Sequence, residues 1–245
     1  MSSSHLSAPL GDLSRARLEL PGGAYQLRLR SHDDVAPKGD DTSRDPYRDP
    51  YREPAREPPE LFRAHFEGMP PQVAVHDGTV RIFYPRFQWL DRRGASGEIA
   101  LARTVPWTIA LSGGASHLDA DLSRLKLEGM TISGALSVVR LLLPRPAGRV
   151  TLVITGGVHR LEILRPAVTP VRLNASGGIQ DLRVDELVLG AVGGGFRWES
   201  PTGGGPDGYD IGISGGASGI TVAHLDAARA APDAAPDGRP EAHTG

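Results

Sequence analysis

The chain has 245 residues, a formal charge of −2 and no cysteine. Without cysteine it has no disulfide framework, thiolate metal site or cysteine nucleophile, and its balanced charge gives no electrostatic reason to expect nucleic-acid binding. Its 31 glycines and 21 prolines exceed average usage, roughly 7 % and 5 %, but stay below the level of a wholly disordered chain. Aromatic residues make up only 5 %, so a core must consist mainly of aliphatic side chains.

Residues 1–12 contain no basic stretch followed by an apolar one, which is the pattern of a secretory signal. Elsewhere no segment reaches the roughly 18 uncharged apolar residues of a membrane span. We therefore expect a flexible N-terminus over residues 1–12 and a cytoplasmic location.

A glycine turn recurs along the chain at a nearly constant spacing. Its first residues are 21, 22 and 21 positions apart at Ser112, Ser133, Thr155 and Ser176, and the same signature begins at Pro21 and Ser214. A repeat of this length is typical of a β-helix or a related solenoid. The turn glycines are Gly22, Gly23, Gly113, Gly114, Gly134, Gly156, Gly157, Gly177, Gly178, Gly215 and Gly216.

Apolar and polar residues alternate on both sides of each turn. Leu152 and Ile154 precede the turn at Thr155, for example, and Leu161 and Ile163 follow it. A period of two predicts a strand on each side of the corner, each with one buried face. We therefore predict an all-β, single-stranded β-solenoid with parallel strands about 4.8 Å apart. Its first coil is expected over residues 13–31 and its main domain over residues 72–223.

The outward position between the two buried residues after each turn carries charges of alternating sign. In chain order these are Asp119, Arg140, Glu162, Arg183 and Glu199. If successive coils stack in sequence, the five side chains form one ladder in which opposite charges face each other, a favourable arrangement by roughly 0.2–1 kcal/mol per pair.

Two segments do not follow the repeat. In residues 32–71 a proline recurs every fourth residue from Pro46 to Pro58, which excludes helix interiors and central strands, so we predict a disordered insertion or linker. Residues 60–68 within it could form a short helix, and residues 73–82 a hairpin or a further coil. Residues 224–245 are rich in Ala, Pro and Asp without an apolar period, which predicts a disordered tail.

Three segments resemble a known group of proteins. Residues 105–116, 190–194 and 209–222 are similar to actinobacterial hypothetical proteins of the putative-adhesin, β-strand-repeat type. They are more distantly similar to the C-terminal domain of LiaF-like cell-envelope stress regulators. The resemblance covers about residues 70–222 and implies a β-solenoid or stacked-sheet fold, with no established catalytic residues to transfer.

Patterns typical of catalytic or metal sites lack their usual context. Residues 212–216 match a G-x-S-x-G nucleophile elbow around Ser214, but an elbow requires a helix after the serine, where the repeat predicts a strand. His117 and His159 lie near carboxylates without a third ligand. Acidic residues resemble the paired carboxylates of β-helix polysaccharide enzymes: Asp119, Asp121, Asp181 and Asp185. We expect no enzyme, no cofactor and no metal.

These features favour a non-enzymatic scaffold or protein-interaction module, in a setting of envelope stress or surface attachment. Its partner would contact the face that bears Arg140 and Arg183, or the Pro-rich insertion. One alternative is end-to-end self-assembly of the bactofilin type. The other is a carbohydrate-active enzyme on a β-helix. Residues 83–89, which alternate aromatic and polar side chains, are expected to cap an open end or to bind sugar rings or a partner.

Overall fold

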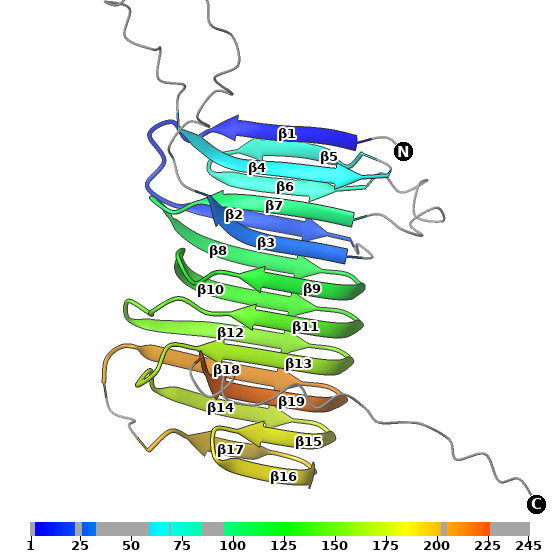
Figure 1. Ribbon diagram of the computed structural model, residues 1–245, viewed down its shortest axis with the longest axis vertical. Coiled ribbons are helices and arrows are strands. Elements are labelled where there is room, and N and C mark those ends of the chain that lie inside the picture. The colour runs from blue at the N-terminus through cyan, green and yellow to red at the C-terminus, as the bar shows by residue number, and fades with distance from the viewer. Residues whose placement is uncertain are drawn as a thin grey trace, which may run out of the picture.

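The computed structural model describes residues 3–22, 26–32, 59–68, 70–84, 96–201 and 205–225, which form two β-sheets (Figure 1). The strands of sheet A are β1 (Ser3–Pro9), β3 (Gln26–His32), β4 (Glu60–Glu67), β7 (Ser96–Ala102), β9 (Ala115–Asp121), β11 (Leu136–Leu142), β13 (Val158–Arg165), β15 (Ile179–Val184), β16 (Leu187–Val192) and β19 (Ala217–His224). Those of sheet B are β2 (Ala16–Pro21), β5 (Gln72–His76), β6 (Thr79–Phe83), β8 (Pro106–Ser112), β10 (Lys126–Ser133), β12 (Arg149–Thr155), β14 (Val171–Ser176), β17 (Phe196–Glu199) and β18 (Gly208–Ser214). The predicted all-β class is confirmed, with mainly parallel pairing.

Six coils build most of the structure, each a strand of sheet B followed by a turn and a strand of sheet A. They are β2–β3, β8–β9, β10–β11, β12–β13, β14–β15 and β18–β19. The core lies between the two sheets, and the residues predicted to be buried on either side of each turn are buried. In the fourth coil, for example, Leu152 and Ile154 are each 1 % exposed and Leu161 and Ile163 are 0 % exposed.

The first glycine of the turn is required by both conformation and contact in four coils, at Gly134, Gly156, Gly177 and Gly215. Gly156 has a φ of 115°, and a Cβ atom there would lie 2.2 Å from the carbonyl oxygen of Gly134 in the adjacent third coil. Gly134 and Gly215 are crowded by neighbouring turns in the same way. The second glycine is different, because a Cβ on Gly157 would meet nothing within 4 Å. Of the remaining predicted turn residues, Gly23 lies outside the described residues.

The coils do not stack in chain order. Strand β18 pairs in parallel with β12 on one side and β14 on the other, and β19 pairs with β13 and β15. The last coil is therefore inserted between the fourth and the fifth, as the orange strands among the yellow and green ones in Figure 1 show. This corrects the expected sequential order. After β15 the chain turns back through β16 and β17, which pair antiparallel with β15 and β14, and then returns to fill the gap.

The N-terminal third also departs from the predicted organisation. Residues 3–9, expected to be flexible, form the edge strand β1 of sheet A, and residues 60–67, expected to be helical, form β4 between β1 and β7. Phe62, Ala64 and Phe66 alternate into the core, which is the strand period. Of the two expectations for residues 73–82, a hairpin or a further coil, the structure shows the hairpin, β5–β6. Residues 33–58, 85–95 and 226–245 lie outside the described residues, so most of the Pro-rich insertion, Trp89 and the tail stay as predictions.

Candidate interaction face on sheet A

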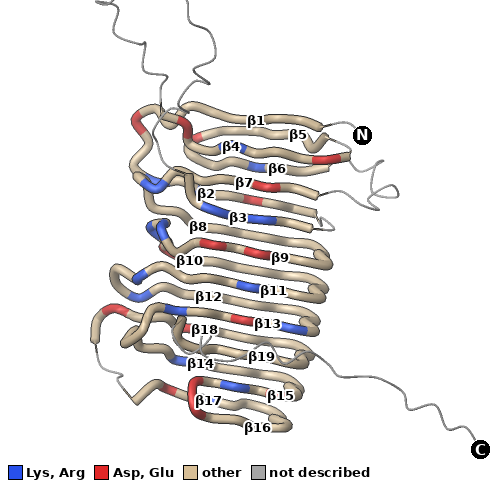
Figure 2. Tube along the Cα trace, in the orientation of Figure 1, with Lys and Arg blue, Asp and Glu red and all other residues tan. Residues whose placement is uncertain are grey.

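One outward-facing column of side chains crosses the whole of sheet A. Neighbouring members occupy opposed positions on adjacent strands, about 4.8 Å apart. From β1 to β16 the column consists of His5, His65, Glu98, Arg28, Asp119, Arg140, Glu162, Thr221, Arg183 and Val188. Charges of alternating sign therefore follow one another over five strands, from β7 to β13, as the red and blue segments in Figure 2 show.

The pairs in this column are exposed. Arg140 Nε lies 3.2 Å from Glu162 Oε2, and the two side chains are 58 % and 37 % exposed. Water and salt screen such a pair, so that its contribution to the free energy of unfolding is at most about 1 kcal/mol. The column therefore sets the charge pattern of the face more than it stabilises the sheet.

The structure brings together three residues of the predicted ladder and separates the other two. Asp119, Arg140 and Glu162 face one another on β9, β11 and β13. Thr221 of the inserted coil lies between Glu162 and Arg183. Glu199 is on the other sheet, in β17, where its Oε1 lies 3.0 Å from Arg172 Nε.

Two ladder members were missed in the sequence. Arg28 stands between the buried residues Leu27 and Leu29, in the same place relative to its turn as Asp119, so the repeat already contained its signal. Glu98 does not follow the repeat spacing, because the residues seven positions earlier, from Asp91, are not a glycine turn. It faces Arg28 because β7 adds to β3 as an extra parallel strand.

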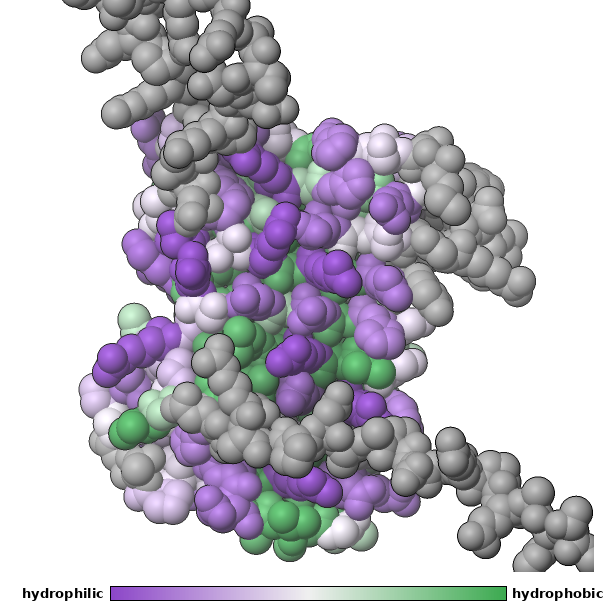
Figure 3. All heavy atoms as spheres, viewed as in Figure 1, coloured by the Kyte–Doolittle hydropathy of each residue, from purple (hydrophilic) through white to green (hydrophobic). Residues whose placement is uncertain are grey.

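Arg183 differs from the other cations of the column. It is exposed and faces Thr221 on one side and Val188, which is 65 % exposed, on the other. Among the described residues no carboxylate forms an ion pair with it. Val188 lies on β16, the edge strand of sheet A, and Figure 3 shows hydrophobic residues gathered at this lower end of the stack. Within the part of the chain that the structure describes, Arg183 thus lies beside exposed apolar surface and the edge strand β16.

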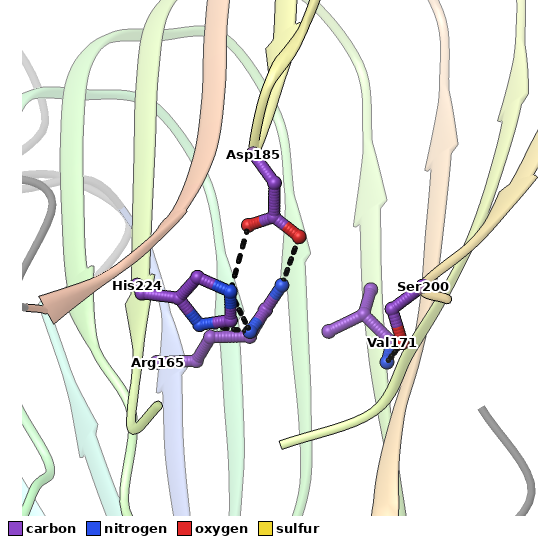
Figure 4. A network of polar contacts seen from close by, with 5 residues as sticks. All are labelled: Arg165, Val171, Asp185, Ser200 and His224. Carbon is purple, nitrogen blue, oxygen red and sulfur yellow. Dashed lines mark hydrogen bonds and ion pairs between the residues drawn. The ribbon is translucent and has the colours of Figure 1, made fainter. Parts of the chain in front are cut away.

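A buried polar cluster ties the inserted coil to its neighbours. Arg165, Asp185 and His224 end or follow the adjacent strands β13, β15 and β19 and point toward one another (Figure 4). The fully buried guanidinium of Arg165 forms an ion pair with Asp185 and contacts the His224 ring, whose Nε2 lies 3.5 Å from Asp185 Oδ1. Burial lowers the pKa of Arg165, and the Asp185 carboxylate opposes that shift.

The inserted coil is also held at its other strand. The buried Tyr209 hydroxyl, at the start of β18, donates a 2.6 Å hydrogen bond to the carbonyl oxygen of Pro144. Burial raises the pKa of this hydroxyl above its ordinary value, so Tyr209 stays protonated and remains a donor. Ser200 directly follows β17, and its hydroxyl accepts a 3.0 Å hydrogen bond from the backbone amide of Val171, the first residue of β14 (Figure 4).

The candidate catalytic and metal residues do not converge. Ser214 ends β18, and the strand β19 follows it, so the helix of a nucleophile elbow is missing at this point. Asp119 and Asp121 lie on β9 and Asp181 on β15, with β11, β13 and β19 between them. His159 contacts the Ser218 hydroxyl at 2.9 Å. Within the described part of the chain, no three His, Cys, Asp or Glu side chains are grouped so as to hold a metal ion.

Comparison with solved structures shows the fold. A putative cell adhesion protein from Clostridium sporogenes ATCC 15579 has a similar structure with a TM-score of 0.68 at 17 % sequence identity, over 91 % of this chain and 99 % of that one. A putative adhesin from Bacteroides fragilis NCTC 9343 matches with a TM-score of 0.31 at 11 % identity, over 91 % of this chain and 97 % of that one. No family model matches the sequence, and no curated protein is similar to it at a significant level. Within the described ranges, no helix has the length and hydrophobicity to cross a membrane.

Proposed function

We propose that the chain is a non-enzymatic β-solenoid interaction module that docks a protein partner on the sheet A face at Arg183. Coils of two strands, parallel pairing between coils and stacked glycine turns support the solenoid form. The similarity to a solved structure described as a putative cell adhesion protein supports a role in surface contact.

The observation that carries the proposal is the break in the charge column at Arg183. Along β7 to β13 each charge has an opposite neighbour, whereas Arg183 faces Thr221 and the exposed Val188. Arginine beside exposed apolar surface is typical of the residues that dominate protein interfaces. The partner that fits is a segment with an acidic residue next to an apolar one, since these complement Arg183 and Val188. Its backbone could also pair with the open edge of β16.

Reversal of the charge at this position tests the proposal. Tagged wild type, Arg183→Glu and Arg172→Glu are used as baits in extracts of the source cells, with quantitative mass spectrometry of the bound proteins. Arg172 is the control for charge reversal outside sheet A, because it is an exposed arginine on the outer face of sheet B; its reversal also removes the ion pair with Glu199. We expect at least one protein to be retained by wild type and Arg172→Glu and reduced about tenfold with Arg183→Glu, since a charged hydrogen bond is worth about 1.5–3 kcal/mol.

Equal recovery of every bound protein with all three baits would contradict the docking role of Arg183. Recovery of the untagged chain itself as the main partner would favour self-assembly instead. Within the described ranges, the edge strands at which such assembly would begin are β1 and β5 at one end of the stack and β16 and β17 at the other.

A further inference from the structure

A polar hollow lies toward the opposite end of sheet A, where β1, β4, β7 and β3 are neighbours. It has a volume of about 450 Å³ and is lined mainly by basic and imidazole side chains, among them His5, Arg30, Arg63 and His65. A volume of this size falls in the range of small-ligand sites, roughly 300–1,000 Å³. The neighbouring hollow beyond His65 and Glu98 is about 200 Å³ and includes Arg28.

Two arginines lie on either side of the hollow, with Ala100 between them on the middle strand. Arg63 on β4 and Arg30 on β3 are both register partners of Ala100 on the intervening strand β7. The two backbones are therefore two strand spacings apart, about 9–10 Å. Ala100 is 8 % exposed and has no side chain beyond Cβ, so at this register position β7 places no long side chain between the two arginines.

A carboxylate anchors each of these arginines. Arg63 Nε pairs with Glu60, and Arg30 Nη2 pairs with Glu98. Burial alone raises the pKa of Glu60, but hydrogen bonds from Arg63 and Ser7 outweigh it and hold the pKa below its ordinary value, so the anchor is ionised. A guanidinium has five N–H donors, so each arginine is oriented by its carboxylate and keeps donors for a ligand.

Imidazoles supply the remaining polar wall. The His5 and His65 rings are 4.4 Å apart between centroids, and His65 also faces Glu98 on β7. Arg28 and Glu67 lie beside His65 in the neighbouring hollow. His32 is the third imidazole that lines the main hollow, and it interacts electrostatically with the Glu60 carboxylate. His65 Nδ1 is buried, and no described group forms a hydrogen bond with it. The two arginines and their two carboxylates balance in charge, so an anion would be held mainly by the remaining N–H donors of the arginines.

We infer that this hollow binds an oxyanion group, such as a carboxylate or a sulfate, between Arg30 and Arg63. Oriented guanidinium groups pair with such anions through parallel hydrogen bonds. A metal ion does not fit, because no three described His or carboxylate side chains are arranged to hold one. The site is independent of the proposed docking at Arg183, which lies five strands away from β3 on the same sheet.

The test is a titration of the full chain followed by NMR. Inorganic sulfate represents a free anion, glucuronate represents a carboxylate carried on a sugar, and glucose is the uncharged control of similar size. We expect saturable shifts at Ala100 and His65 with at least one of the two anions and none with glucose.

Variants decide whether the hollow is responsible. Arg30→Gln and His65→Gln should each weaken anion binding about tenfold, whereas Arg183→Gln, an arginine change elsewhere on the same sheet, should leave it unchanged. Tighter binding of glucuronate would assign the site to a sugar-borne carboxylate, and tighter binding of sulfate to a free anion. The proposal is overturned if neither anion gives saturable shifts, or if Arg30→Gln and Arg183→Gln weaken binding equally. The NMR spectrum of each variant reports whether it is folded.

Discussion

Gly156→Ala is expected to destabilise the protein by about 3–5 kcal/mol, whereas Gly157→Ala should change the free energy of unfolding by less than about 0.5 kcal/mol. The alanine Cβ at position 156 would overlap the Gly134 carbonyl oxygen in the next turn, and the φ of 115° is unfavourable for any side chain. Neither problem exists at position 157, and the equivalent residue of the third coil is Ala135. Thermal and denaturant unfolding of the two variants measures the difference.

The paired design excludes a general effect of removing glycine. Both variants lose one glycine in the same turn, so the unfolded chain is stiffened equally. Similar midpoints for Gly156→Ala and Gly157→Ala would mean that the turns are not packed backbone against backbone.

Asp185→Asn is expected to cost about 3 kcal/mol, because it leaves the Arg165 charge buried without a compensating carboxylate. Arg165 is 0 % exposed, and its partner carboxyl is 14 % exposed. The asparagine has nearly the same shape and tolerates the φ of 50° found at position 185, so the change removes little besides the charge. The matched control is Glu162→Gln, which neutralises the acid of the exposed pair with Arg140 and should cost less than about 1 kcal/mol.

Chemical denaturation of both variants gives the comparison. Equal small losses would show that Arg165 does not depend on Asp185, and therefore that this cluster does not hold the inserted coil between its neighbours.

The contents of each coil were predictable from the sequence, because the strand period is local. Leu161 and Ile163 lie two residues apart after a glycine turn, and that spacing alone gives their burial. The order of the coils was not predictable in the same way. In the structure Glu162 is opposite Thr221 of the last coil. The coil that follows Glu162 in sequence has Arg183 at the same position. The alternation of buried and exposed residues is satisfied by either coil as the neighbour of β13. What decides between them is the excursion through β16 and β17. The glycine turn at residues 192–194 predicts one more coil there, with Glu199 on the ladder, whereas the two strands pair antiparallel with β15 and β14.

The candidate sites differ in the same way, because only those built from consecutive coils could be predicted from the sequence. The central part of the charge column, Asp119 to Glu162, comes from consecutive coils and was therefore visible. The hollow combines side chains from residues 5, 30, 63 and 98, which four strands bring together from separate parts of the chain. Two of those strands, β1 and β4, lie in segments predicted to be flexible or helical. No local pattern could place them side by side.

The insertion of the last coil is tested most directly by engineered disulfides, since the chain has no cysteine of its own. Residues 162 and 221 are register partners on β13 and β19, which places their Cα atoms within disulfide reach, whereas 162 and 183 are separated by β19. We predict rapid intramolecular oxidation of the Glu162→Cys/Thr221→Cys variant and none of the Glu162→Cys/Arg183→Cys variant, measured by mass spectrometry under native conditions. The opposite result, a disulfide between 162 and 183 alone, would mean that the coils stack in chain order.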